Sequence, residues 1–279
     1  MDRKEKRVLV TRAIDQAEKM KKKLESAGCK PVICPVIEFK PPVNWKPVDE
    51  AIENLKEYNW LIFASANAVT FFLDRCEALK LNFDLFKKIK FGAIGSQTQK
   101  ALEKRNVSVS YCPSKFIAEE FVEQFPDRDK FKELKILWPR TNVGRMLIYD
   151  EFTKCGATVS MLEVYRTELP ENFEELSMRL FNLLSNKEID VITVASSQTV
   201  RNLVLCLKRG MISYARTQGF IVNSESKALE PAIKSMLADT TIASIGPITT
   251  ATTKDLLGKV DIESDEQTID ALIESIQNS

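Results

Sequence analysis

The chain has 279 residues, of which 44% are apolar and 28% are charged, a balance typical of a globular protein long enough for two domains. Its 40 basic and 39 acidic residues leave a net charge of +1, which excludes the global field expected of a nucleic-acid-binding protein. Histidine is absent, the six cysteines lie apart, and neither glycine-rich nucleotide motif occurs. We therefore expect no metal and no cofactor.

The chain also lacks the signals of a membrane or secreted protein. Its longest apolar run, at 61–73, carries Ser and Asn and is too short to span a bilayer. The charged opening leads directly into a strand-like run without a signal-peptide apolar region. Cysteines without paired spacing fit a reducing compartment. These features predict a cytoplasmic monomer with no membrane partner and no nucleic-acid partner.

Short runs rich in β-branched residues alternate with helical patterns along the chain. In chain order, strands are expected at 7–11, 60–65, 90–95, 135–140, 191–196 and 241–246. Helical patterns between them include 15–28, which ends at a glycine, and 118–125. Continuous apolar strands separated by helices predict an α/β fold with parallel sheets covered on both faces.

The second half of the chain repeats the first. The matching pairs of segments are 6–13 with 134–141, 60–73 with 191–204, 91–104 with 242–256, and 111–125 with 262–276. Equivalent residues lie 128 positions apart in the first pair, 131 in the second and 151 in the last two. The jump from 131 to 151 predicts an insertion of roughly twenty residues within 208–238.

Polar residues and one glycine follow the expected strands, at the sheet edge where parallel sheets bind ligands. The candidates for substrate binding are Arg12, Ser65, Asn67, Ser96, Thr98, Arg140, Ser196, Ser197, Gly246 and Thr249. Thr98 and Thr249 lie three residues beyond a repeated glycine, where helix N-termini favour anions; plain N-capping is the alternative. The serines and Asn67 could be ordinary turn residues, and the two arginines could face water.

The ordered motifs VLVTRA, SANAV, AIGSQTQKAL, LWPR, VYRT, ASSQTVRNL and ASIGPITT resemble the uroporphyrinogen-III synthase family over roughly residues 7–276. The region 208–238 has no recognisable counterpart. The resemblance implies two related small α/β domains with parallel sheets, joined by a two-stranded linker, with a cleft between them. The implied boundaries are 1–36 with 168–279 for the first domain, 40–162 for the second, and 34–42 with 163–170 for the linker.

The resemblance also implies an activity. The family closes hydroxymethylbilane, a linear tetrapyrrole with eight carboxylates, into uroporphyrinogen III, with loss of water, inversion of the last pyrrole and no cofactor. Tyr165, in the VYRT motif, matches a family tyrosine that would donate to the departing hydroxyl; the alternative is an aromatic residue that only packs the linker. A non-catalytic two-lobed binding or regulatory protein of the same fold is the competing functional interpretation.

Overall fold

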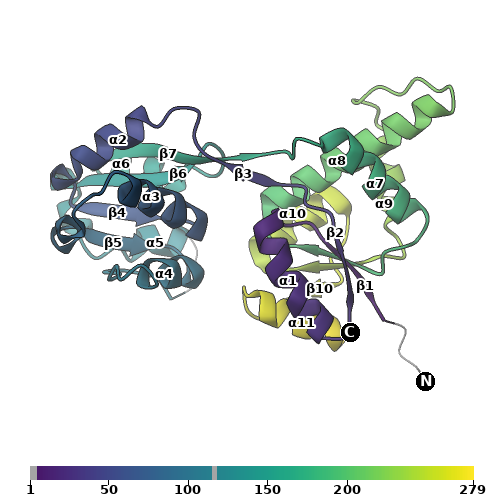
Figure 1. Ribbon diagram of the computed structural model, residues 1–279, viewed down its shortest axis with the longest axis horizontal. Coiled ribbons are helices and arrows are strands. Elements are labelled where there is room, and N and C mark those ends of the chain that lie inside the picture. The colour runs from purple at the N-terminus through teal and green to yellow at the C-terminus, as the bar shows by residue number, and fades with distance from the viewer. Residues whose placement is uncertain (1–4, 115–117) are drawn as a thin grey trace. The chain divides into compact units, whose positions relative to one another are not determined.

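The computed structural model describes residues 5–114 and 118–279. These form two compact units. One, here called the terminal unit, contains the chain up to Glu38 together with Glu168–Ser279; the other, the middle unit, is Phe39–Thr167. Figure 1 labels most of the helices and strands of both units.

The terminal unit is built on a five-stranded sheet in the order β10-β9-β8-β1-β2. Its strands are β1 (Arg7–Val10), β2 (Lys30–Ile33), β8 (Val191–Val194), β9 (Thr241–Ser244) and β10 (Ile262–Glu263), all paired in parallel. Its helices are α1 (Ile14–Ser26), α7 (Phe173–Ser185), α8 (Ser197–Thr217), α9 (Leu229–Met236), α10 (Pro247–Leu257) and α11 (Ile269–Gln277). Side chains of α1 and α11 pack on one face of the sheet, and those of α7 to α10 pack on the other.

The middle unit has a second five-stranded sheet, in the order β3-β7-β6-β4-β5. Its strands are β3 (Glu38–Lys40), β4 (Trp60–Phe63), β5 (Lys90–Ala93), β6 (Lys135–Thr141) and β7 (Thr158–Glu168), and β4 to β7 pair in parallel. The helices are α2 (Lys46–Glu53), α3 (Ala66–Ala78), α4 (Ser96–Glu103), α5 (Ala118–Glu123) and α6 (Leu147–Lys154). Short 3-10 turns lie at η1 (Leu55–Glu57), η2 (Phe83–Lys88) and η3 (Arg128–Glu133).

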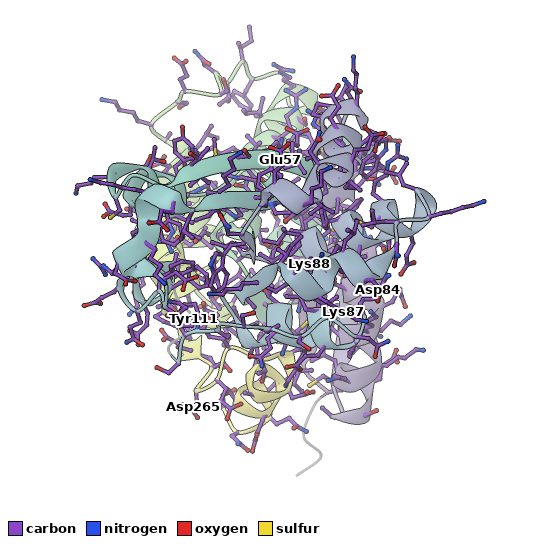
Figure 2. All side chains as sticks on the ribbon, turned by 90° about the vertical axis from the view of Figure 1, so that its left-hand side faces the viewer. Glu57, Asp84, Lys87, Lys88, Tyr111 and Asp265 are labelled. Carbon is purple, nitrogen blue, oxygen red and sulfur yellow. The ribbon has the colours of Figure 1, made fainter. Side chains whose placement is uncertain are left out.

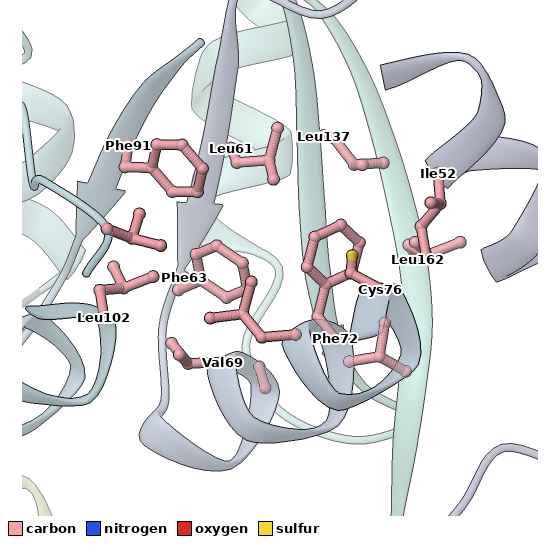
Figure 3. Close-up of a cluster of buried hydrophobic side chains, with 14 of the residues drawn as sticks. Ile52, Leu61, Phe63, Val69, Phe72, Cys76, Phe91, Leu102, Leu137 and Leu162 are labelled. Atoms are coloured by element: carbon pink, nitrogen blue, oxygen red, sulfur yellow. The ribbon is translucent and has the colours of Figure 1, made fainter. Parts of the chain in front are cut away.

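Each face of the middle sheet carries its own apolar core. Phe63 and Leu137 point to the side covered by α2, α3 and α4, where Phe72 of α3 packs edge-on against Phe63 at 5.7 Å between ring centroids (Figure 3). Trp60 and Trp138 belong to the opposite core, formed with α5 and α6. The α/β class and the parallel sheets predicted from sequence are confirmed.

The strand registers reproduce the sequence repeat residue by residue. A duplicated unit should pair equivalent residues at the same offsets, because register fixes which side chains face each core. Leu9 pairs with Ile192 in the terminal unit as Leu137 pairs with Leu61 in the middle unit. In the same way, Ile192 pairs with Ile242 as Leu61 pairs with Phe91, and Ile262 pairs with Ala243 as Tyr111 pairs with Gly92. These pairs carry the same offsets of 128, 131 and 151 that the sequence shows. The two units are therefore copies of one design.

The predicted insertion lies where the offsets change. α8 has 21 residues, whereas its equivalent α3 has 13. The further helix α9 follows α8 and buries Leu229 and Ile233 in the terminal unit. The segment 208–238 thus lengthens one helix and adds another to the same face of the sheet.

Candidate functional site

Two serines follow equivalent strands and begin equivalent helices. Ser65 comes after β4 and its Oγ accepts a hydrogen bond from the Ala68 N–H at 3.1 Å; Ser196 comes after β8 and accepts from the Thr199 N–H at 3.2 Å. Both are therefore helix N-caps, which satisfy backbone donors that the first helical turn leaves free. Capping gives both serines a structural role and leaves each hydroxyl proton available for another partner.

Tyr165 lies on β7 and is only 4% exposed. Its ring stacks on Phe71 of α3 with centroids 5.3 Å apart and meets Phe39 of β3 edge-on at 5.7 Å. The phenol oxygen lies 3.2 Å from Ser65 Oγ. Apolar contacts thus hold the ring, while the hydroxyl sits at the polar end of the strands.

The surroundings of this phenol favour its neutral form. Burial raises the pKa of Tyr165 above its ordinary value, and hydrogen bonding with Ser65, Thr141, Thr167 and Asn67 opposes that rise. A phenol whose pKa is raised stays protonated at neutral pH. It can therefore donate a hydrogen bond without first taking up a proton. Ser65, Asn67 and Tyr165, all predicted from sequence, come together here.

Arg140 also lies at this edge but faces its own loop. Its guanidinium sits 4.5 Å from the centre of the Trp138 ring and donates to the carbonyl oxygens of Thr141, Val143 and Gly144 at 3.1 to 3.2 Å. Burial lowers the pKa of Arg140, and the nearby Tyr165 opposes that change. The donors of this arginine hold the 141–144 backbone in place.

Arg12, its equivalent in the terminal unit, has fewer partners. Its Nε and Nη2 both donate to Gln16 Oε1, at 3.1 and 2.9 Å. Within residues 5–114 and 118–279, no carboxylate lies within ion-pair distance of Arg12, and burial lowers its pKa. A partly desolvated guanidinium without a counter-ion gains from binding a carboxylate, because the Coulomb attraction then acts in a poorly solvated site.

The structure of the two Ile-Gly loops tests whether Thr98 and Thr249 are helix N-caps. The N-caps of α4 and α10 are Gly95 and Gly246, and neither cap makes a side-chain hydrogen bond. Thr98 and Thr249 lie three residues further on, in the first turns, where they are 4% and 6% exposed. The N-capping interpretation of these threonines is therefore wrong. Ser96 is the first residue of α4.

Two other predicted residues are engaged within the terminal unit. The Ser197 hydroxyl is 2.7 Å from Thr252 Oγ1 and therefore joins α8 to α10. Gly246 lies under Gln267, whose Cγ would be only 2.8 Å from a Cβ at this position. A side chain at Gly246 would displace Gln267 from above the start of α10.

The sequence did not single out Thr141 and Thr167, which lie near the Tyr165 hydroxyl, or Asn142, which is hydrogen-bonded to both. The Asn142 side-chain oxygen accepts from the Thr167 N–H and from Thr141 Oγ1, both at 2.9 Å, and the two threonine hydroxyls are 2.8 Å apart. Their positions in the sequence could have indicated them, because Thr141 directly follows Arg140 and Thr167 is the last residue of the VYRT motif.

A separate hollow of about 680 Å³ lies at another part of the middle unit. It has an apolar floor that includes Phe86 and Phe91, and its rim includes Asp84 and Lys87, which Figure 2 labels together on η2. None of the predicted site residues lines it.

Neither a metal cluster nor a membrane span occurs in the described part of the chain. No three His, Cys, Asp or Glu side chains there gather closely enough to hold a metal ion. No helix among the described residues combines the length and apolar content needed to cross a bilayer.

Comparison with known proteins identifies the family. The sequence model described as "Uroporphyrinogen-III synthase HemD" matches residues 18–274. A uroporphyrinogen-III synthase from Synechococcus elongatus is 30% identical over 98% of this chain and 94% of its own, and one from Chlorobaculum parvum is 28% identical over 81% and 89%. The crystal structure of a mutant uroporphyrinogen III synthase from Thermus thermophilus superposes with a TM-score of 0.68 at 16% identity, covering 98% of each chain. The chain belongs to the uroporphyrinogen-III synthase family.

Proposed function

We propose that this chain closes hydroxymethylbilane into uroporphyrinogen III, with loss of water and inversion of the last pyrrole ring. Family membership supports the reaction, and one structural observation supports a chemical role within it. That observation is the Tyr165 phenol, which is buried and lies 3.2 Å from the Ser65 hydroxyl at the carboxyl ends of β4 and β7. Such a phenol is suited to donate to a departing hydroxyl.

The reaction asks the protein for positioning more than for a nucleophile. Loss of the terminal hydroxyl gives an azafulvene cation, and ring closure at the substituted end of the last pyrrole requires that the chain be held in one conformation. Polar groups fixed in advance stabilise the cation without reorganising. In this proposal Tyr165 donates to the leaving oxygen, while Ser65 and Asn67 hold the phenol.

The eight carboxylates of the substrate need cationic and N–H partners. We assign them to Arg12, which lacks a carboxylate partner among the described residues, and to the first turns of α4 and α10, the helices that follow the Ile-Gly loops. The remaining contacts in this proposal are Ser96, Thr98, Ser196, Ser197, Gly246 and Thr249. Arg140 has a supporting role, since its donors fix the 141–144 backbone.

The domain arrangement belongs to the same proposal. It comprises domains at 1–36 with 168–279 and at 40–162, linker strands at 34–42 and 163–170, and a substrate cleft between the domains. Support comes from β3 and β7, which are hydrogen-bonded neighbours and lie next to both points where the chain passes between units. We also propose that the protein acts as a monomer in the cytoplasm.

Incubation with hydroxymethylbilane tests the proposal directly. The purified protein, treated exhaustively with EDTA and given no nucleotide, should form type III uroporphyrinogen at an undiminished rate, because the sequence offers no histidine and no nucleotide loop. Chromatographic separation of the type I and type III products measures this. Formation of type I alone, at the spontaneous rate, would favour the non-catalytic binding protein, and activity that returns only with added metal would contradict the cofactor-free mechanism.

Removal of the Thr98 or Thr249 hydroxyl should weaken substrate binding while the fold persists. Thr98→Val and Thr249→Val keep the buried volume, and the caps are glycines, so no cap is lost. We expect KM to rise about tenfold for each, the effect of one hydrogen bond to a carboxylate. Thr253→Val is the matched control, since its hydroxyl donates to the Thr249 carbonyl oxygen within α10. An unchanged KM in both variants would restrict these threonines to packing.

A further inference from the structure

Three side chains beside Tyr165 form a hydrogen-bond chain at the ends of β6 and β7. Thr141 lies opposite Tyr165 in the register of the two strands, at a point where the pairing shifts by one residue. The Asn142 Oδ1 atom accepts from Thr141 Oγ1 and from the Thr167 N–H, each at 2.9 Å. Thr167 Oγ1 lies 2.8 Å from Thr141 Oγ1 and completes the chain.

The direction of every proton in this chain follows from one backbone group. The Thr167 N–H can only donate, so the Asn142 atom that meets it must be the carbonyl oxygen. That oxygen can only accept, so the Thr141 hydroxyl must donate to it. The single proton of Thr141 is then committed, and Thr167 must donate to Thr141. Both hydroxyl protons therefore run toward Asn142.

This order limits what the two threonines can offer the phenol. Each can accept a hydrogen bond from the Tyr165 hydroxyl, but neither can donate to a phenolate unless both hydroxyls turn round. A threonine lowers the pKa of Tyr165 only by donating, and such donation requires that reversal. In this order the threonine pair accepts from a neutral phenol, and it can stabilise an anionic phenol only after both hydroxyls have turned round.

We propose that Asn142 is a positioning residue for Tyr165: by drawing the Thr141 and Thr167 protons away from the phenol, it leaves both threonine oxygens as acceptors and favours the protonated phenol, the form that can donate a hydrogen bond. The inference rests on the role of Tyr165 in hydroxyl departure proposed above. Asn142 acts only through the two threonines, whose hydroxyls its carbonyl oxygen orders.

The other groups around the phenol are compatible with this role. Phe39 and Phe71 cover the ring and carry no charge. Arg140 of β6 is a charged side chain near the phenol, and its guanidinium donates to the carbonyl oxygens of Thr141, Val143 and Gly144. Ser65 remains as a hydroxyl that can donate to the phenol oxygen, because its cap bond uses only its lone pair.

The test is an NMR titration of the full-length protein with tyrosines labelled at the ring carbon that carries the hydroxyl. The Tyr165 signal is assigned with Tyr165→Phe. Asn142→Leu releases the Thr141 proton and Thr141→Val releases the Thr167 proton, so in each variant one threonine hydroxyl can turn toward the phenolate. The pKa of Tyr165 should therefore fall by about one pH unit, the effect of one hydrogen bond to a charged group. Asn142→Asp keeps an acceptor for both donors and adds negative charge, so the pKa should not fall.

An unchanged or raised pKa in both Asn142→Leu and Thr141→Val would overturn the proposal, as would a fall in Asn142→Asp equal to that in Asn142→Leu. Thr141→Val also serves as the second probe if Asn142→Leu does not fold. These readouts need no substrate. They therefore decide the role of Asn142 even where the wild-type protein fails to convert hydroxymethylbilane, a result that would instead reject the proposed function.

A turnover profile against pH gives a second readout. A neutral phenol is required for donation, so turnover is present below the pKa of Tyr165 and is lost as the pH rises through it. A lower pKa in Asn142→Leu should move the alkaline limb of the profile to lower pH by the same amount. A limb that stays in place while the titration moves would separate Tyr165 ionisation from turnover and reject the positioning role.

Discussion

Tyr165→Phe is expected to lower the turnover of hydroxymethylbilane by about 100-fold while the protein remains folded. The ring keeps its stacking on Phe71 and its edge contact with Phe39, so packing is preserved. Only the hydroxyl and its hydrogen bonding with the side chains around it, Ser65 above all, are lost, at a cost of about 1 kcal/mol in the free energy of unfolding. Steady-state turnover and thermal melting of the same preparation measure both effects.

The products distinguish the donor role from a role in shape. With the ring in place, the enzyme-formed fraction from Tyr165→Phe should remain type III, and type I should rise only because spontaneous closure competes with a slower enzyme. Tyr165→Ala, which removes the ring from its contacts with Phe39 and Phe71, should lose both rate and isomer control. Tyr58→Phe in the same unit is the matched control. If Tyr165→Phe turned over at the wild-type rate, the phenol would have no part in the departure of the hydroxyl, and that step would have to depend on main-chain groups and on the conformation of the substrate.

The sheets could be predicted well from the sequence because each strand is marked by its own apolar run and the pattern of runs occurs twice in the chain. Buried parallel strands need nearly continuous apolar runs, and the six predicted runs contain β1, β4, β5, β8 and β9 in full and β6 except for its last residue, Thr141. The offsets of 128, 131 and 151 then reappear in the strand registers, since a register error would turn a strand's apolar side chains away from their core. The sheet edge that carries the candidate residues follows from those two facts.

Side-chain direction could not be predicted in the same way. Arg140 and Arg12 occupy equivalent positions, yet one is held by carbonyl oxygens and the other has only Gln16 as a hydrogen-bond partner within the described chain. That difference depends on the conformation of the 141–144 loop, which no sequence motif predicts. The caps are similar: Ser or Thr is the stronger sequence signal for an N-cap, but the extended backbone at Gly95 starts α4 earlier than Thr98.

The duplication also shows where the two units have diverged. Tyr165 is equivalent to Ile37 by the offset of 128, and Phe71 is equivalent to Asn202 by the offset of 131. In the terminal unit the Asn202 side-chain amide donates to the Val36 carbonyl oxygen at 2.8 Å. At the equivalent place in the middle unit, the rings of Phe71 and Tyr165 stack on each other. The phenol is therefore a property of one copy, which argues for a task specific to the middle unit rather than a requirement of the fold.

Close packing of α7 against α8 depends on Gly210. A Cβ at this position would lie 2.4 Å from the Ser177 carbonyl oxygen and 2.7 Å from Phe181 Cβ. The first of these is a backbone atom of α7, so it cannot move away without moving the helix. Because Gly210 lies in the segment that the sequence could not match to the family, its role is visible only from this contact.

Gly210→Ala is accordingly expected to lower the free energy of unfolding by about 2 kcal/mol, and Gly210→Leu by more. Alanine gains about 1 kcal/mol in helix propensity, so a net loss means that the overlap with Ser177 outweighs that gain. Ser213→Ala on the same helix is the control and should leave the melting temperature nearly unchanged. Denaturant and thermal unfolding measure the difference. A melting temperature at or above the wild-type value in Gly210→Ala would show that α7 and α8 separate without cost, and that the close approach of the two helices contributes nothing to stability.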